Sequence, residues 1–360
     1  MMNKNQEALL SLLTYSIGDN KKLLVGNNVD WSEVMNMSFY HEVSSIVFDS
    51  YRTIHSSLGN ESLSMDDVME WLGQVAIQET QYEAQYKSAA KLAELYYTNH
   101  IRTYVLKGFS ISLCYPMPFH RYSCDFDCFL TTMDPINKWD AYTLANSIVE
   151  SKSIPVDRSY YKHSEFLFED LHVENHRFCC SVRRGRRTAD LEAYLQWMLC
   201  NEEPEYIEET KLALPPLMFQ ALFLIEHACT HFLYEKMSIK NICDWAMFKK
   251  HYQDRLDWDE FYAMCVRFGL DRFVNTMSGL AGYVLGKCEY DDLSPLDKRV
   301  LDDTLKEVEL PKNKMRQRFH KAYDVLRSSW KFKYFNRDSM IKELSHSFFA
   351  YLFVKEPELI

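Results

Sequence analysis

Apolar residues recur every three or four positions through the first hundred residues of the chain, which is the spacing of one helix face. The clearest case is the segment 65–100, whose apolar face comprises Val68, Trp71, Leu72, Val75, Tyr82, Tyr86, Ala89 and Leu92. Ser64 stands where a helix cap belongs, and Asp66 and Asp67 follow in the first turn, where the helix dipole favours anions. The pattern predicts a helical region over residues 1–100.

Between residues 101 and 200 the pattern becomes that of short strands. The runs "IRTYVLKG" and "DFDCFL" are typical of strands, and "HSEFLFEDLHVENHRFCC" predicts a hairpin that turns at Glu169-Asp170. A short helix over "FSISLCY" should stop at Pro116, and a longer one should begin with Asp134 as its cap and Pro135 at its first position. This order of elements predicts an α/β or α+β core.

Residues 201–360 return to helical spacing, in segments such as "PPLMFQALFLIEHACTHFLYE", "SIKNICDWAMFKKHY" and "DWDEFYAMCVRFGL". Gly and Pro number only 10 each, so flexible linkers are scarce. The fold class that we predict is α+β. A mixed-sheet core at 101–200 is expected between an N-terminal helical region, 1–100, and a C-terminal helical region, 201–360.

The sequence carries 41 basic and 51 acidic residues, which gives a net charge of −10. This balance argues against a general nucleic-acid-binding surface but leaves room for a local basic cleft. The ten cysteines have no spacing typical of a disulfide framework, no secretory leader precedes the first helix, and the apolar run 347–354 is too short to span a bilayer. We therefore expect a cytoplasmic protein with reduced thiols and no membrane partner.

Two carboxylates inside an apolar strand are the first sign of chemistry. In a strand, residues two apart lie on one face, roughly 6.6–6.8 Å from each other, so Asp125 and Asp127 should project together while Phe126 points into the core. Two like charges raise one another's pKa unless a cation lies between them, and Mg²⁺ is the natural cation for carboxylate oxygens. The alternative is a pair of solvated carboxylates at a strand end.

Further candidate ligands surround this pair in the sequence. The same alternation places His172, Glu174 and His176 on one face of the hairpin, so Glu174 offers a third carboxylate. Lys107-Gly108 stands at a strand-to-helix turn, where free N–H groups and the lysine charge suit a triphosphate.

The order L-K-G, Y-P, R, D-x-D and V-E-x-H resembles the uncharacterised nucleotidyltransferases of the polymerase-beta-like superfamily. In that superfamily a glycine turn precedes an acid-x-acid strand, and a third acid lies on a neighbouring strand. The matching positions are Lys107, Gly108, Tyr115, Pro116, Arg121, Asp125, Asp127, Val173, Glu174, Asn175 and His176. His227, His231 and Asp244 are similar to the family's downstream helical segment, and the resemblance spans roughly residues 85–250.

The resemblance implies transfer of a nucleoside monophosphate from an NTP, such as ATP, to an acceptor hydroxyl with release of pyrophosphate. Two Mg²⁺ ions would assist, because paired ions clamp the attacking and leaving oxygens of a phosphoryl displacement. The residues implied as catalytic and metal-binding are Asp125, Asp127 and Glu174. Those implied to contact the nucleotide are Lys107, Gly108, Ser110, Arg121 and His176. The acceptor, a small molecule or a protein, is not implied.

One departure from the family pattern keeps other functions open. The superfamily places Ser or Gly directly after the glycine, whereas Phe109 stands between Gly108 and Ser110 here. Lys107 and backbone N–H groups would then take over the triphosphate contact. A catalytically inactive, nucleotide-binding regulator on the same fold is the first alternative, and a structural helical interaction protein is the second.

Two basic motifs allow a structural or a ligand-binding role. His227 and His231 are four apart on one helix, a spacing that zinc sites use, but a packed pair facing a cleft between domains is favoured. The arginines of "RRGRR" could bind phosphate or nucleic acid, but a solvated loop is favoured. These arginines are Arg183, Arg184, Arg186 and Arg187.

Overall fold

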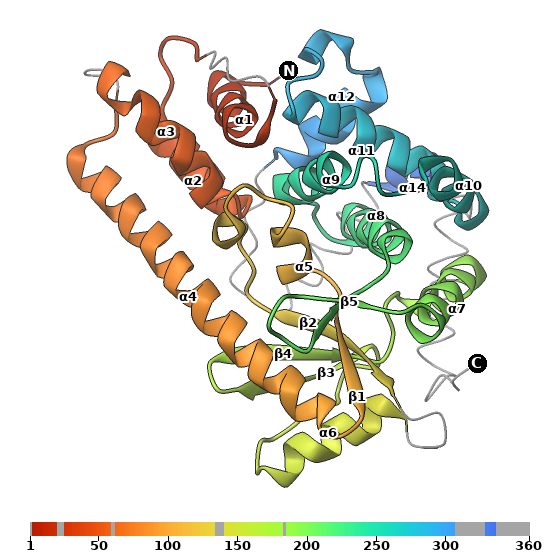
Figure 1. Cartoon of the computed structure of the whole chain (residues 1–360). Helices are drawn as coiled ribbons and strands as arrows, with labels where there is room; N and C mark the ends of the chain where they lie inside the picture. Colours follow the sequence, from red (N-terminus) through yellow and green to blue (C-terminus); the bar gives the residue numbers. More distant parts are fainter. Residues whose placement is uncertain are drawn as a thin grey trace.

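The computed structural model describes residues 2–19, 25–58, 62–133, 140–182, 185–306 and 328–335. Along the described chain, helical segments precede and follow the strands of one mixed sheet, as the sequence predicted (Figure 1). The N-terminal helices are α1 (Lys4–Ile17), α2 (Trp31–Tyr40), α3 (Ser44–Leu58) and α4 (Met65–Tyr97). Ser64 caps α4 by accepting a hydrogen bond from the Asp67 backbone N–H, and Trp71 and Val75 are buried on its apolar face.

Within the described residues, six strands form a single sheet in the order β3-β4-β2-β1-β6-β5. The strands are β1 (Ile101–Val105), β2 (Phe126–Thr132), β3 (His163–Phe168), β4 (Leu171–His176), β5 (Glu205–Tyr206) and β6 (Leu212–Leu214). Strand β2 runs parallel to β4 and antiparallel to β1, and β1 runs parallel to β6. The predicted hairpin is β3-β4, with Glu169 in its turn at a φ of 53°.

Alternation along β2 divides the two faces of the sheet. Phe126 and Cys128 point into an apolar cluster with side chains of α4 and of α6 (Ala141–Ser151). Phe129 points the other way, into a second cluster built mainly from the N-terminal and C-terminal helices. Asp127 lies between Phe126 and Cys128 in β2, so its side chain is on the same face as Phe129. It therefore points toward the second cluster and away from the cluster that contains α4 and α6.

The described part of α6 begins at Ala141, with Asp140 as its cap through a bond from the Tyr142 backbone N–H to Oδ1. Several positions considered in the sequence lie outside the described residues. These are Asp134, Pro135, Arg183, Arg184 and the run 347–354.

The C-terminal part is helical, as predicted, apart from β5 and β6, which the sequence pattern did not reveal. Its helices are α7 (Arg186–Asn201), α8 (Leu217–Tyr234), α9 (Ile239–His251), α10 (Trp258–Phe268), α11 (Asp271–Val284), α12 (Pro295–Thr304) and α14 (Ser329–Phe335). Helix α11 packs against both α9 and α1, so the first helix and the described C-terminal helices share one apolar core. None of the described helices has the length and apolarity needed to cross a bilayer.

Candidate active site

A glycine turn ends β1 beside the start of β2. Gly108 has a φ of 64°, and a Cβ built on it would meet Ser123 Oγ at 2.9 Å, so both the backbone and the space require glycine here. Helix α5 (Phe109–Ser112), which follows, is a single turn and contributes little dipole. The turn places Lys107 over the first residues of β2, where its Nζ lies 3.0 Å from Asp127 Oδ1.

Strand pairing brings the predicted carboxylates together. In the parallel β2-β4 pair, Asp127 is the register partner of Glu174 and Phe126 is the partner of Val173. Asp125, just before β2, contacts His172 of β4, with 3.0 Å between Oδ1 and Nδ1. Asp125, Asp127 and Glu174 therefore share one face of neighbouring strands, as the alternation predicted.

Asp127 is the most buried of the three, with 2% of its side chain exposed. His176 Nε2 lies 3.0 Å from the same Oδ1 that Lys107 contacts. Burial alone would raise the pKa of Asp127, but Lys107 and His176 outweigh it and hold that pKa well below its usual value. Burial would likewise lower the pKa of His176, but its contacts with Asp127 and Glu174 raise it. Asp127 is thus kept ionised by the Lys107 ammonium and by its contact with His176.

Glu174 lies between two histidines. His163 Nδ1 is 2.8 Å and His176 Nε2 is 3.2 Å from Glu174 Oε2. Burial would raise the pKa of Glu174, but these two contacts bring it down to about 2. His163 Nδ1 approaches the carboxylate without the angle of a hydrogen bond. Ligand atoms of His163, Glu174 and His176 lie within 4.8 Å of one another, so this trio could also hold a metal ion.

The residues present fit the divalent metal that the resemblance implies. Carboxylate oxygens are the ligands that Mg²⁺ prefers, and Asp125, Asp127 and Glu174 supply them from one face. His172 Nδ1 lies 3.0 Å from Asp125 Oδ1 without a hydrogen-bond angle, and Asp125 Oδ2 accepts a hydrogen bond from Cys124 Sγ at 3.2 Å, so Asp125 has only weak partners that a cation could displace.

A cavity of about 400 Å³ opens in front of the aspartates. Its floor is formed by Lys107, Gly108, Arg121, Ser123, Cys124, Asp125 and Asp127. The rest of its lining comes from the end of α2, from α8 and from the start of α9, through Tyr40, His41, Glu42, Leu224, His227, His231, Lys236, Met237, Ser238, Lys240, Asn241 and Asp244. This volume falls within the roughly 300–1,000 Å³ of small-molecule sites.

The histidine pair of α8 faces this cavity. The rings of His227 and His231 lie edge to face with centroids 4.4 Å apart, as expected for a packed pair. Burial, and next the charge of Lys107, hold the pKa of His227 well below its usual value, so the ring is neutral. His231 Nδ1 lies 2.8 Å from Glu235 Oε2. His227 therefore contributes a neutral, polar group to the cavity lining.

Arg121 joins the sheet core to the helices. Its Nε and Nη2 donate to Asp244 at 3.0 Å and 2.6 Å, and its Nη1 donates to the Tyr122 carbonyl oxygen at 3.1 Å. The Tyr115 hydroxyl donates to the same Asp244 at 2.8 Å. All three guanidinium nitrogens thus have protein partners, and the structure gives Asp244, whose role the sequence left open, a part in this connection.

Three of the predicted residues lie behind the cavity floor. Glu174 and His176 flank Asp127 but are not among the described residues that line the cavity. Ser110 is fully buried, and within the described chain its hydroxyl has no hydrogen-bond partner. A nucleotide contact of Ser110 or Arg121 therefore stays a prediction, whereas Lys107 and Gly108 face the cavity directly.

Sequence reasoning missed several residues of this site. His163 and Glu165 alternate on β3 in the same way that His172 and Glu174 alternate on β4, and this hairpin signal was available in the sequence. His41 and Lys236 had no such signal, because nearly two hundred residues separate them along the chain.

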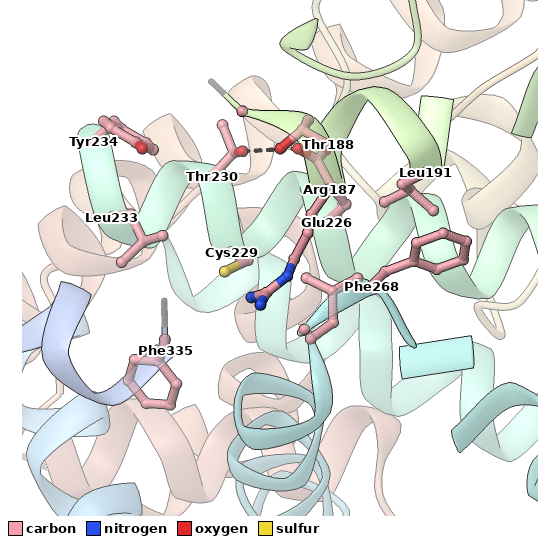
Figure 2. A pocket seen from close by; sticks show the side chains of 13 residues that line it. Arg187, Thr188, Leu191, Glu226, Cys229, Thr230, Leu233, Tyr234, Phe268 and Phe335 are labelled. Atoms are coloured by element: carbon pink, nitrogen blue, oxygen red, sulfur yellow. Dashed lines mark hydrogen bonds between the residues drawn. The ribbon is translucent and has the colours of Figure 1, made fainter. Parts of the chain in front are cut away.

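A smaller hollow of about 80 Å³ lies between α7, α8 and the segment after α10. Figure 2 shows the Arg187 side chain reaching along α8 between Cys229 and Phe268. Beside it, the Thr230 hydroxyl donates to Glu226 Oε1 at 3.0 Å. This space is too small for a nucleotide. Arg187 belongs to the first turn of α7 and packs over Gly269, so it does not lie in the solvated loop expected from the sequence.

Comparison with known proteins agrees with this arrangement. A family model described as an uncharacterised nucleotidyltransferase matches residues 27–286, well over half of the chain. Searches among curated proteins and among solved structures gave no match. The matched span contains the glycine turn, the carboxylate strands and the helices that form the cavity wall. The chain therefore belongs to this family of uncharacterised nucleotidyltransferases.

Proposed function

We propose that the protein transfers a nucleoside monophosphate from an NTP to an acceptor hydroxyl and releases pyrophosphate. The observation that supports this most is the register of β2 and β4, which sets Asp127 opposite Glu174 and beside Asp125, next to a cavity of nucleotide size. The acceptor oxygen would attack the α-phosphorus, the bond from that phosphorus to the pyrophosphate oxygen would break, and the hydroxyl proton would leave to solvent.

Asp125, Asp127 and Glu174 would hold the two Mg²⁺ ions. When bound, the ions supply charge neutralisation of the phosphates and make the acceptor hydroxyl more acidic. Glu174 is a weak base, because its pKa is about 2, so we assign it to metal binding rather than to proton abstraction. Lys107 would contact the phosphates of the donor, a role supported by its position in the cavity lining beside Gly108.

One observation favours the inactive regulator as a second candidate. Lys107 Nζ and His176 Nε2 both contact Asp127 Oδ1, and a site whose carboxylate is engaged by protein groups can bind a nucleotide without turning it over. The purely structural alternative is weaker, because it gives no reason to bury an ionised carboxylate at the edge of a polar cavity.

The reaction is tested by pyrophosphate release from ATP and the other NTPs in Mg²⁺, with a broad panel of hydroxyl acceptors. Loss of an ion ligand should cost far more rate than affinity, so Asp127→Asn should lower pyrophosphate release by orders of magnitude. Asp291→Asn, a change at a fully exposed carboxylate, is the matched control and should keep wild-type activity.

Two other outcomes would contradict the proposal. Wild-type protein whose melting temperature rises with NTP and Mg²⁺, but which releases no pyrophosphate with any acceptor, would indicate the regulator. Wild-type protein that does not respond to nucleotide at all would indicate the structural role.

A cytoplasmic location also belongs to this proposal. All ten cysteines lie in the described residues, and none of them forms a disulfide bond. Such a pattern is typical of a reducing compartment.

A further inference from the structure

The cavity wall that faces the aspartates is built largely from polar groups of two distant segments. The end of α2 contributes Tyr40 and His41, and the segment at the start of α9 contributes Lys236 and Lys240. We call these four residues the α2/α9 wall. The mechanism proposed above uses none of them.

His41 is the most unusual residue of the α2/α9 wall. Its side chain is fully buried, and within the described chain neither ring nitrogen has a hydrogen-bond partner. Burial, helped by the charge of Lys236, lowers its pKa to about 4, so the ring is neutral and offers one donor and one acceptor. Buried polar groups in folded proteins almost always have partners. A neutral imidazole that lines a cavity without one is placed for a ligand.

Lys236 gives the wall a positive charge. Its Nζ donates to the Tyr40 hydroxyl at 2.7 Å and lies 4.4 Å from the centre of that ring, but it has no carboxylate partner among the described residues. Lys240, by contrast, is paired with Glu42 at 2.5 Å. Helix α9 begins between these lysines. A capping box there satisfies the N–H groups of Ser238 and Asn241, and the N–H groups of Ile239 and Lys240 lack intrahelical partners, as the first N–H groups of a helix do.

We propose that the α2/α9 wall is the acceptor subsite and that it binds a phosphate group on a small hydroxylated acceptor. Lys236 and the start of α9 would hold the anion, and His41 would donate one hydrogen bond to it. This inference rests on the proposed function, because only a transferase needs an acceptor.

The position of the wall separates it from the donor end of the cavity. Lys107 and His227 interact with Asp127, so that end suits the donor phosphates. Burial raises the pKa of Cys124, the neighbour of Asp125, and the charges of Lys240 and Glu42 also act on that pKa. These two residues therefore lie near the Asp125 end of the cavity. An acceptor held there would lie at this end, where its hydroxyl could approach the aspartates. The positive charge of Lys236, which has no carboxylate partner among the described residues, also disfavours polycationic acceptors.

The test is calorimetric titration of the full chain with glycerol 3-phosphate and, as an uncharged match, with glycerol. Only the phosphate ester should bind. Because a hydrogen bond to a charged group is lost, Lys236→Gln and His41→Phe should each weaken its affinity about tenfold or more. Both variants should fold, because Phe at position 41 keeps an aromatic ring and because Lys236 is only half-buried. If one variant does not fold, the other still tests the subsite. The control is Lys211→Gln, whose ammonium lies 4.4 Å over Tyr97 and away from the cavity, and it should bind like wild type.

The titration is repeated with a saturating non-hydrolysable ATP analogue and Mg²⁺, where glycerol 3-phosphate should still bind. Competition between the two would overturn the acceptor assignment and give the wall to the donor phosphates. Absence of binding, or equal affinity in the Lys236→Gln variant, would overturn the subsite altogether while leaving the transferase reaction untouched. A wild-type protein that binds glycerol 3-phosphate through Lys236 but no nucleotide would support the anion site and refute the proposed function.

Discussion

Replacing Asp127 with Asn should destabilise the metal-free protein, whereas the same change at Asp125 should not. Asp127 is 2% exposed, and Lys107 Nζ and His176 Nε2 both lie 3.0 Å from its Oδ1. Asn keeps the shape of the side chain but removes the charge, so both cationic partners lose their counter-ion. Treating Asp125 and Asp127 as a repelling pair, as the sequence alone suggests, predicts the opposite sign, with stability unchanged or raised.

The size of the loss follows from burial. Removing one member of a buried ion pair typically costs about 3–5 kcal/mol. The cost should be smaller here, because water screens Lys107, which is 27% exposed, and because His176 can release its proton. We expect the free energy of unfolding to fall by about 1–3 kcal/mol. Asp125 and His172 are 37% and 44% exposed, so losing their contact should cost about 0–1 kcal/mol.

Urea unfolding at neutral pH, in chelator and without nucleotide, measures this difference. Asp291→Asn, at a fully exposed position, sets the baseline. The double change Lys107→Met with Asp127→Asn should cost less than the sum of the single changes, since the two groups interact. An Asp127→Asn protein that is as stable as wild type, or more stable, would refute the pairing that underlies our account of the site.

Further predictions concern the connections around the site. Asp244→Asn should lower the free energy of unfolding by about 3–5 kcal/mol, because the buried Arg121 charge is left uncompensated; urea unfolding checks this. His120 lies 2.6 Å and 2.9 Å from carboxylates of α3 and α4, which outweigh burial and raise its pKa. The stability that it contributes should be fully present below the unfolded-state pKa of about 6.5 and be lost as pH rises through the folded-state pKa. Melting temperatures at stepped pH should show that loss in wild type and not in His120→Gln. Lys107→Ala should weaken NTP binding in thermal-shift titrations, and unchanged affinity would remove Lys107 from the site.

The faces on which the carboxylates lie could be predicted from the sequence, because alternation in a strand is a local property. The hairpin around Glu169 followed for the same reason, since turn residues separate two alternating runs. Local patterns also gave the cap of α4 at Ser64. The glycine of the turn at Gly108 is explained by its positive φ and by the approach of Ser123, which only the folded chain reveals.

Long-range pairing could not be predicted in this way. The parallel match of β2 with β4, which sets Asp127 opposite Glu174, is decided by packing between strands that are far apart in sequence. Strands β5 and β6 have only two and three residues, too few to show a period. The cation beside Asp127 was equally hidden, because nothing in the sequence says that Lys107 bends back onto the strand that follows.

That lysine links metal binding to nucleotide binding. In the metal-free protein Lys107 neutralises Asp127, so Mg²⁺ alone must compete with a resident cation for the same oxygens. The triphosphate of an NTP offers Lys107 another anionic partner and thereby frees Asp127. Each ligand should therefore raise the affinity for the other by the same factor, as reciprocal coupling requires. Titration of Mg²⁺ with and without nucleotide would measure that factor. In Lys107→Met the factor should shrink because Mg²⁺ alone binds more tightly, and an unchanged factor would show that Lys107 is a bystander in both events.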